Sequence, residues 1–292
     1  MRIQSVNYQN SYTNKSANKG EFKPAVNFTS LQSKVAQEAV PEVKQAGKSL
    51  RLLLKEIMGR YKVVDGDYTV NTDIFKWKEL LVKGEVTIPD SRTLRSKIKA
   101  TKGADIMGNI GKGGELDVTG PCIVQYGSEI GSKLSVDGET ELTGKILEGS
   151  EFKSKYLYMH SRSEISSKNA AVEETTVMDA ATINEGAHLQ TGKLVAYWIS
   201  KIGGRVDTSE AHLNAHLLRT GEINTKILNL DILAELDKGS VVNCEKARVF
   251  KEYDKSLNPI WLDISPEILG KKYPGIRIMR EGWYDEFIKS GK

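Results

Sequence analysis

A six-residue repeat between Ile98 and about residue 157 is the feature that most constrains this sequence. The first position of each hexad is mostly apolar: Ile98, Ala104, Ile110, Leu116, Cys122, Ser128, Leu134, Thr140, Ile146 and Phe152. The third position is also mostly apolar, and glycine fills the fifth at Gly108, Gly114, Gly120, Gly138 and Gly144. A helical bundle would not show this period.

Apolar residues at alternate positions place their side chains on one face of a short strand. A glycine two positions later allows a tight corner. The best-matched hexads begin at Ile98, Leu116 and Leu134, so three strand-and-corner units make a coil of about 18 residues. The sequence therefore predicts a mainly β fold, a single-stranded parallel β-helix (β-solenoid), whose handedness stays open.

The distribution of proline extends this prediction beyond the clear hexads. The chain has seven prolines, none of them between Pro121 and Pro259, although this stretch contains many of its 26 glycines. Strands that pair on both sides need their N–H donors, which proline lacks. After Tyr158 the six-residue step weakens but returns at Val177, Ile183 and Leu189. We therefore predict a β-solenoid over residues 85–250.

The regions outside the solenoid have other compositions. Residues 1–33 are rich in Asn, Gln, Ser and Thr, which predicts a disordered polar leader. Residues 34–84 predict a helical extension, broken near Pro41, with a second short helix from Thr72 to Lys83. Residues 251–292 are rich in aromatic residues and predict an irregular segment followed by a short helix. This C-terminal cap or tail would cover the open end of the solenoid.

The N-terminal arm is basic and the main body is weakly acidic. Residues 43–62 predict an amphipathic helix with Val43, Leu50 and Ile57 on its apolar face and Lys48 and Lys55 opposite. Such a helix can contact an anionic membrane surface or pack on the next domain. The acidic body is a poor surface for nucleic acid.

The N-terminal sequence has no apolar segment of the kind found in a secretory signal peptide. Cys122 and Cys244 match no metal-binding spacing and predict two separate, buried, reduced thiols. We therefore expect a cytoplasmic protein, which the basic arm could hold at the inner face of the membrane.

The hexads, together with the runs GGELDVTG and GSKLSVDGETELTGKI, resemble those of the bactofilins, bacterial cytoskeletal proteins that form polymers. The resemblance covers residues 98–157 well and 158–250 loosely. It implies a β-helix that assembles end to end without nucleotide, with residues 1–62 in the place of the family's membrane-contacting tail. It favours a non-catalytic structural scaffold that self-associates as a homopolymer through its solenoid.

Two other functions stay open, a rigid solenoid that serves as a binding module and a hexapeptide-repeat acyltransferase. The enzyme would need a histidine as general base, for which His188 and His160 are the candidates. His212 and His216 would share one face if residues 209–221 formed a helix, and could then bind a metal. The glycines from Gly108 to Gly114 lack the pattern of a phosphate loop. We predict no catalytic, cofactor-binding or metal-binding residues.

Overall fold

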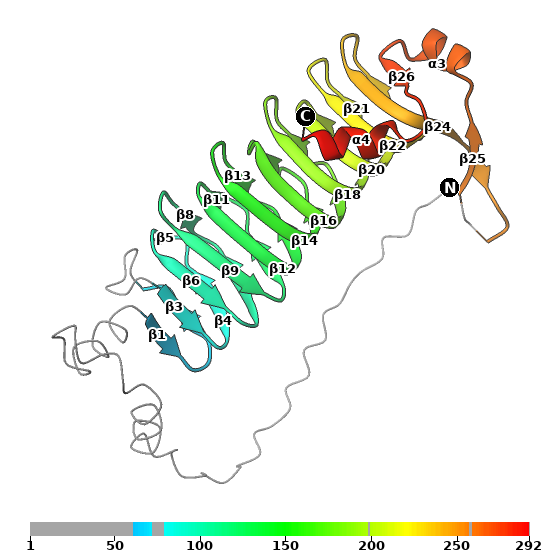
Figure 1. The fold of residues 1–292 in the computed structure, drawn as a ribbon. Coiled ribbons are helices and arrows are strands. Elements are labelled where there is room, and N and C mark those ends of the chain that lie inside the picture. The colour runs from blue at the N-terminus through cyan, green and yellow to red at the C-terminus, as the bar shows by residue number, and fades with distance from the viewer. Residues whose placement is uncertain (1–60, 72–78, 198, 257–258, 292) are drawn as a thin grey trace, which may run out of the picture. The chain divides into compact units, whose positions relative to one another are not determined.

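The computed structural model describes residues 61–71, 79–197, 199–256 and 259–291. Within them the chain forms a parallel β-solenoid of about 10 coils of about 18 residues each (Figure 1). Every complete coil has three faces, and its strands pair in parallel with the equivalent strands of the next coil. The predicted fold class is therefore confirmed.

The strands of the coils form three faces. Face 1 contains β1 (Tyr61–Val64), β3 (Glu79–Val82), β6 (Lys97–Ala100) and β9 (Glu115–Thr119). Face 2 contains β2 (Tyr68–Thr69), β4 (Glu85–Ile88), β7 (Gly103–Ile106) and β10 (Cys122–Val124). Longer strands then span both faces: β12 (Lys133–Leu142), β14 (Glu151–Met159), β16 (Asn169–Met178), β18 (His188–Ala196), β20 (Arg205–Leu213), β22 (Glu222–Leu230) and β24 (Val241–Tyr253).

Face 3 is a nine-stranded sheet of two-residue strands. These are β5 (Thr93–Leu94), β8 (Asn109–Ile110), β11 (Glu129–Ile130), β13 (Lys145–Ile146), β15 (Glu164–Ile165), β17 (Thr182–Ile183), β19 (Lys201–Ile202), β21 (His216–Leu217) and β23 (Glu235–Leu236). We call the bend between faces 1 and 2 corner 1, the loop between faces 2 and 3 corner 2, and the loop back to face 1 corner 3. The long strands run around corner 1, and several shift register there, as between Val136 and Glu139 of β12.

The core is a set of inward-pointing ladders along the solenoid. Ile98, Ala104 and Ile110, which begin successive hexads, point inward from faces 1, 2 and 3 and are buried. The face 3 ladder is almost entirely aliphatic: Leu94, Ile110, Ile130, Ile146, Ile165, Ile183, Ile202 and Leu217. Burying each such side chain contributes about 1.5–3 kcal/mol relative to leaving it exposed. The hexad repeat therefore encodes the core.

Both cysteines lie in this core. Cys122 on β10 and Cys244 on β24 are buried and unbonded, as the sequence predicted. Burial raises the pKa of each thiol to about 12, which keeps both protonated and unreactive.

The helix predicted over residues 72–83 is wrong in its second half. Glu79–Val82 form β3, which pairs in parallel with β1 and β6. Leu80 and Val82 point into the core. The apolar residues of this segment therefore alternate with period two, as in a strand, and do not follow the period of a helix. Within the described residues, coil strands are therefore present before residue 85, from Tyr61 on, and the helical extension predicted over 34–84 does not hold for residues 61–64 and 79–84. Residues 1–60 and 72–78, with the leader and most of the basic helix, lie outside the described residues.

The helix considered for residues 209–221 is also wrong. Arg205–Leu213 form β20 and His216–Leu217 form β21. Ala211, Leu213, Ala215 and Leu217 alternate into the core, while His212 and His216 lie on faces 2 and 3. The segment is an ordinary coil and not an excursion from the solenoid.

The C-terminal segment adds four elements to the last coil. β24 runs beyond the coil and forms an antiparallel pair with β25 (Pro259–Asp263). α3 (Pro266–Lys272) follows, then β26 (Ile276–Ile278), which stacks in parallel on β24. α4 (Trp283–Ser290) ends the described chain and lies along face 1 (Figure 1). The predicted aromatic short helix is confirmed as α4, but the segment before it is more ordered than expected.

Candidate functional site

The four histidines lie apart and form no common site. His160 is in the corner 2 loop of residues 160–163, with Nε2 4.0 Å from a carboxylate oxygen of Glu141. His216 Nε2 lies 2.9 Å from Asp237 Oδ1. In the described ranges no group of three or more His, Cys, Asp or Glu side chains is arranged to hold a metal ion. The metal site considered for His212 and His216 therefore loses its geometric basis.

The strongest polar cluster of the described chain surrounds Asp207 on the outer side of face 1. Its side chain is 1% exposed. His188 Nε2 lies 2.7 Å from Oδ2, and the Arg205 guanidinium donates to both carboxylate oxygens at 3.0 and 3.1 Å. Asn224 Nδ2 donates to Oδ1 at 2.9 Å. A buried carboxylate with this many donors is held in one orientation.

The pKa of Asp207 is lowered. Burial acts to raise it, but the hydrogen bonds from His188, Arg205 and Asn224, and the charge of Arg205, outweigh burial. Asp207 is therefore a charged carboxylate at neutral pH, and its lone pairs are committed to its neighbours.

Strand register brings this cluster together. Arg205 and Asp207 alternate outward on β20, and the parallel pairing places His188 beside Arg205 and Asn224 beside Asp207. The ladder continues to the last coil, where Asn243 Nδ2 donates to Asn224 Oδ1 at 2.8 Å. Outward polar side chains at equal positions of successive coils thus form one hydrogen-bonded row.

α4 covers this row. Lys226 Nζ lies 3.0 and 3.1 Å from the two carboxylate oxygens of Asp285, and Tyr284 N donates to Glu245 Oε1 at 2.8 Å. The Arg205 guanidinium lies 5.1 Å from the centre of the Phe287 ring, a cation–π contact. Tyr284 is buried, and burial, followed by the negative charges of Asp207 and Asp285, raises the pKa of its hydroxyl. An ion pair, a backbone hydrogen bond and a cation–π contact therefore hold α4 on face 1.

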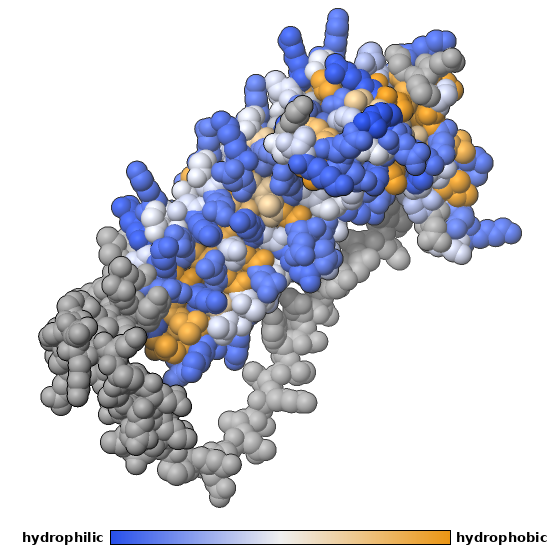
Figure 2. Space-filling view, viewed as in Figure 1, coloured by the Kyte–Doolittle hydropathy of each residue, from blue (hydrophilic) through white to orange (hydrophobic). Residues whose placement is uncertain are grey.

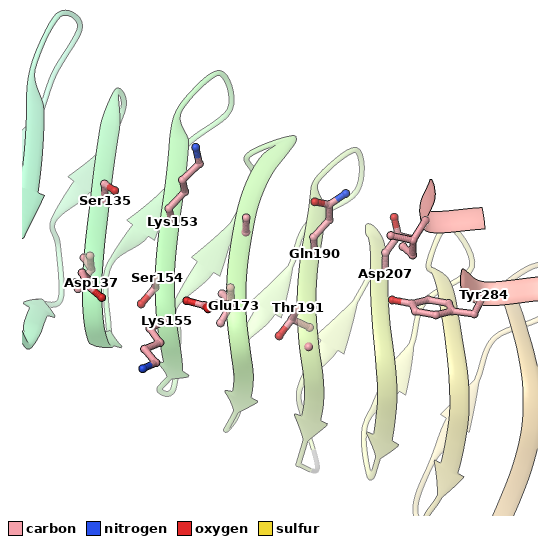
Figure 3. Close-up of a pocket in the computed structure, with 15 residues that line it drawn as sticks. Ser135, Asp137, Lys153, Ser154, Lys155, Glu173, Gln190, Thr191, Asp207 and Tyr284 are labelled. Atoms are coloured by element: carbon pink, nitrogen blue, oxygen red, sulfur yellow. The ribbon is translucent and has the colours of Figure 1, made fainter. Parts of the chain in front are cut away.

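A trough of about 510 Å³ continues along face 1 beyond α4. Figure 3 shows Ser135, Lys153, Gln190 and Asp207 on the strands that line it, with the Tyr284 ring beside Asp207. The corner 1 side carries Asp137, Lys155 and Glu173 in alternating sign. Charges of both signs and short polar side chains thus make this trough a solvated surface.

His188 is the better placed of the two histidines considered for an acyltransferase. Its hydrogen bond to buried Asp207 fixes the ring, as a general base requires. His160 lies on a surface loop beside Glu141 and has no such support. The glycines considered for a phosphate loop lie at two separate corners, Gly108 at corner 2 and Gly111–Gly114 at corner 3.

The C-terminal end presents apolar side chains. Trp261 on β25 contacts His212 edge to face at 4.7 Å and Phe250 at 5.9 Å. Leu269 of α3 is buried, whereas Leu262 is 48% exposed beside a groove of about 240 Å³ between β25 and α3. Figure 2 shows hydrophobic residues at the surface around this end, while most of the same view is hydrophilic.

The sequence did not predict the Asp207 row. Its members recur at coil spacing, Asp207, Asn224 and Asn243, which is the signal that could have found it. That signal is visible only once the length of each coil is known.

No known family matches this chain, and comparisons with curated proteins and with solved structures found no match. In the part of the chain that the structure describes, no helix is long and apolar enough to cross a membrane.

Proposed function

We propose that this protein is a non-catalytic structural scaffold that self-associates through its solenoid, as the resemblance to bactofilins led us to expect. A stack of about 10 coils is an extended element, and a strand at the end of such a sheet can pair with a strand of another chain. No catalytic arrangement is needed for such a role.

The observation that carries this proposal is the outer edge of β25. β25 pairs with β24 on one side, and among the described residues no strand pairs with its other side. Ile260 and Leu262 expose apolar surface on this strand. Because β25 is antiparallel to the coils, α3 and β25 obstruct parallel coil-on-coil stacking at this end. Antiparallel pairing with β25 of a second copy is the contact that fits.

The test is negative-stain electron microscopy and sedimentation of the purified full chain at moderate salt. The β25 contact joins two copies tail to tail, and we expect Leu262→Lys to abolish these pairs and any longer assembly built from them. Ile123→Lys is the matched control, because Ile123 is an equally exposed aliphatic on the outer side of β10. Monomers at every concentration would refute the scaffold, and compact trimers would favour the acyltransferase.

The basic segment 43–62 supplies the possible membrane contact in this proposal. Its positive charge on one side and apolar residues on the other support adsorption to anionic lipid. Pelleting with vesicles that contain phosphatidylserine is the measurement. We expect Lys44→Glu, Lys48→Glu and Lys55→Glu together to abolish it, and unchanged pelleting would remove the membrane from the proposal.

A further inference from the structure

Corners 2 and 3 alternate in length along the solenoid. From β4 to β11 the corner 2 loops contain four residues (89–92), two (107–108) and four again (125–128). The corner 3 loops of the same coils run in the opposite order, 95–96, 111–114 and 131–132. A long corner 2 is thus compensated by a short corner 3, which keeps the coil near 18 residues. Short corners that lie between longer loops leave room for grooves.

One of these grooves lies at corner 2 near the C-terminal end. Its floor is the short corner 214–215, and its walls are the long loops 197–200 and 231–234, of which Trp198 is outside the described residues. The groove has a volume of about 420 Å³ and is lined by Ile199, Ala215, Ile232 and Leu233. Its rim carries Lys201, His216 and Glu235.

The walls of this groove expose large aliphatic side chains. Ile199 is 66% exposed, Ile232 73% and Leu233 58%. Water contact with apolar surface of this size is unfavourable in a free monomer. Exposed aliphatic residues gathered around one concavity are typical of a protein contact surface.

Ile199 is also strained. Its φ is +56°, a left-handed conformation that is rare for a β-branched residue. The third residue of the equivalent loop 125–128 is Gly127, with φ +87° and no such penalty. An isoleucine here is unfavourable both for the backbone and for solvation. Strain of this kind is maintained where a side chain is needed for function.

We propose that this groove binds a second copy of the same chain, side by side and antiparallel. Consider a two-fold axis midway between the coils that begin at Arg205 and at Glu222. It places the 231–234 loop of each copy in the groove of the other. Ile232 and Leu233 then contact Ile199 and Ala215 across the interface, twice by symmetry.

A second copy fits because loops and short corners follow each other at one-coil spacing, about 4.8 Å. Corner 214–215 and loop 231–234 lie one coil apart, so a shift by one coil matches loop 231–234 of each copy with the short corner of the other. The same shift sets Glu235 of one copy beside His216 of the other and one coil from its Lys201, so a carboxylate and an ammonium group come near each other at the rim. A lipid surface would bury the exposed side chains at the ends of the two loops, but unlike a second copy it would leave the groove between the loops unfilled.

The contact spans few coils and buries less than the ~800 Å² per partner of a standard interface, so we expect weak dimers. It uses corner 2 and not β25, and it is therefore independent of the end-to-end contact. In a polymer, many such weak contacts along the sides would add up.

Sedimentation velocity of the full chain carrying Leu262→Lys isolates this surface, because that change blocks the end contact. We expect a monomer–dimer equilibrium that Leu233→Glu weakens at least tenfold. Tyr126→Glu is the control, since Tyr126 is an exposed tip of the equivalent loop far from the groove. Monomers at several hundred micromolar, or equal weakening by both changes, would overturn the proposal.

Cysteine crosslinking identifies the register. Ile199→Cys and Leu233→Cys chains, mixed and oxidised, should form mixed disulfide dimers faster than Tyr126→Cys chains do. The native Cys122 and Cys244 are buried and do not interfere. Absence of this crosslink would overturn the proposed register. Leu233-dependent pelleting with vesicles and no dimer would assign the surface to a membrane instead.

Discussion

The two halves of the solenoid turn corner 1 by different means. The coils up to Gly138 use glycine, at Gly66, Gly84, Gly103, Gly120 and Gly138. Later coils mainly use a hydroxyl that donates to the carbonyl two residues ahead. Ser154 donates to Tyr156 O at 2.7 Å, Thr208 to Glu210 O at 3.0 Å and Thr225 to Ile227 O at 3.0 Å.

The reason for glycine is close contact between backbones of stacked corners. A Cβ on Gly138 would lie 2.4 Å from Gly120 O, and one on Gly120 would lie 2.5 Å from Lys102 O. In the second half the hydroxyl donates a hydrogen bond to a carbonyl across the bend and so holds the bend in shape. One corner shape can therefore be encoded by a missing side chain or by a short polar one.

The halves also differ in what covers face 1. In the outer row of this face, Asp117 in the first half and Asp207 in the second are equivalent by register. Asp117 is partly exposed, whereas α4 and the neighbouring donors bury Asp207. The position that is solvent-accessible at Asp117 is thus a buried polar site at Asp207, because α4 of the C-terminal segment covers it.

The largest effect should come from removing the Asp207 carboxylate. Asp207→Ala removes the buried carboxylate that accepts from His188, Arg205 and Asn224, and we expect a loss of about 3 kcal/mol in the free energy of unfolding. Asp117→Ala should cost less than about 0.5 kcal/mol. Urea unfolding at pH 7 measures both. Equal losses would show that α4 does not change the environment of this row.

The same pair of variants has a predictable pH dependence. The pKa of Asp207 is lower in the folded state than its ordinary value of 3.8. Its stabilising contribution is therefore complete above about pH 4 and is lost as pH falls through the folded pKa. The difference in unfolding free energy between wild type and Asp207→Ala should shrink below pH 4. A difference that stayed constant down to pH 2 would contradict the lowered pKa.

A smaller effect should come from the corner glycines. Gly120 and Gly127 both have positive φ, +104° and +87°, but nothing lies within 4 Å of a Cβ on Gly127. Gly127→Ala should cost about 1 kcal/mol through backbone strain alone. Gly120→Ala adds the clash with Lys102 O, and we expect about 2 kcal/mol more. Chemical denaturation compares the two, and similar losses would mean that corner 1 is not closely packed.

The sequence predicted the solenoid from hexads that the structure places in the core, from Ile98 to Phe152. It predicted the second half less securely because Ser154, Thr208 and Thr225 replace the signal that glycine gives in the first half. Residues 209–221 illustrate the error. Ser209 and Gly221 suggested a capped helix, although Ala211, Leu213, Ala215 and Leu217 alternate as a strand requires.

The Asp207 row and the corner 2 groove could not be predicted from spacing in the sequence. Both depend on which residues of adjacent coils lie opposite each other, and the coils vary between 17 and 19 residues in this half. A single added residue moves every outward side chain to a new neighbour. Core periodicity tolerates this variation, because loops at corners 2 and 3 absorb it.

The smallest effect should come from removing a corner hydroxyl. Thr208 Oγ1 also contacts Gly192 O at 3.2 Å, so Thr208→Val leaves two partly buried carbonyls with less complete hydrogen bonding. Valine keeps the shape and strand preference, and we expect a loss of about 1 kcal/mol. Thr182→Val on the outer side of β17 is the control and should change stability by less than about 0.5 kcal/mol. If Thr208→Val is as stable as wild type in urea unfolding, the shape of the side chain is sufficient to form the later corners, and the hydroxyl hydrogen bonds are not required.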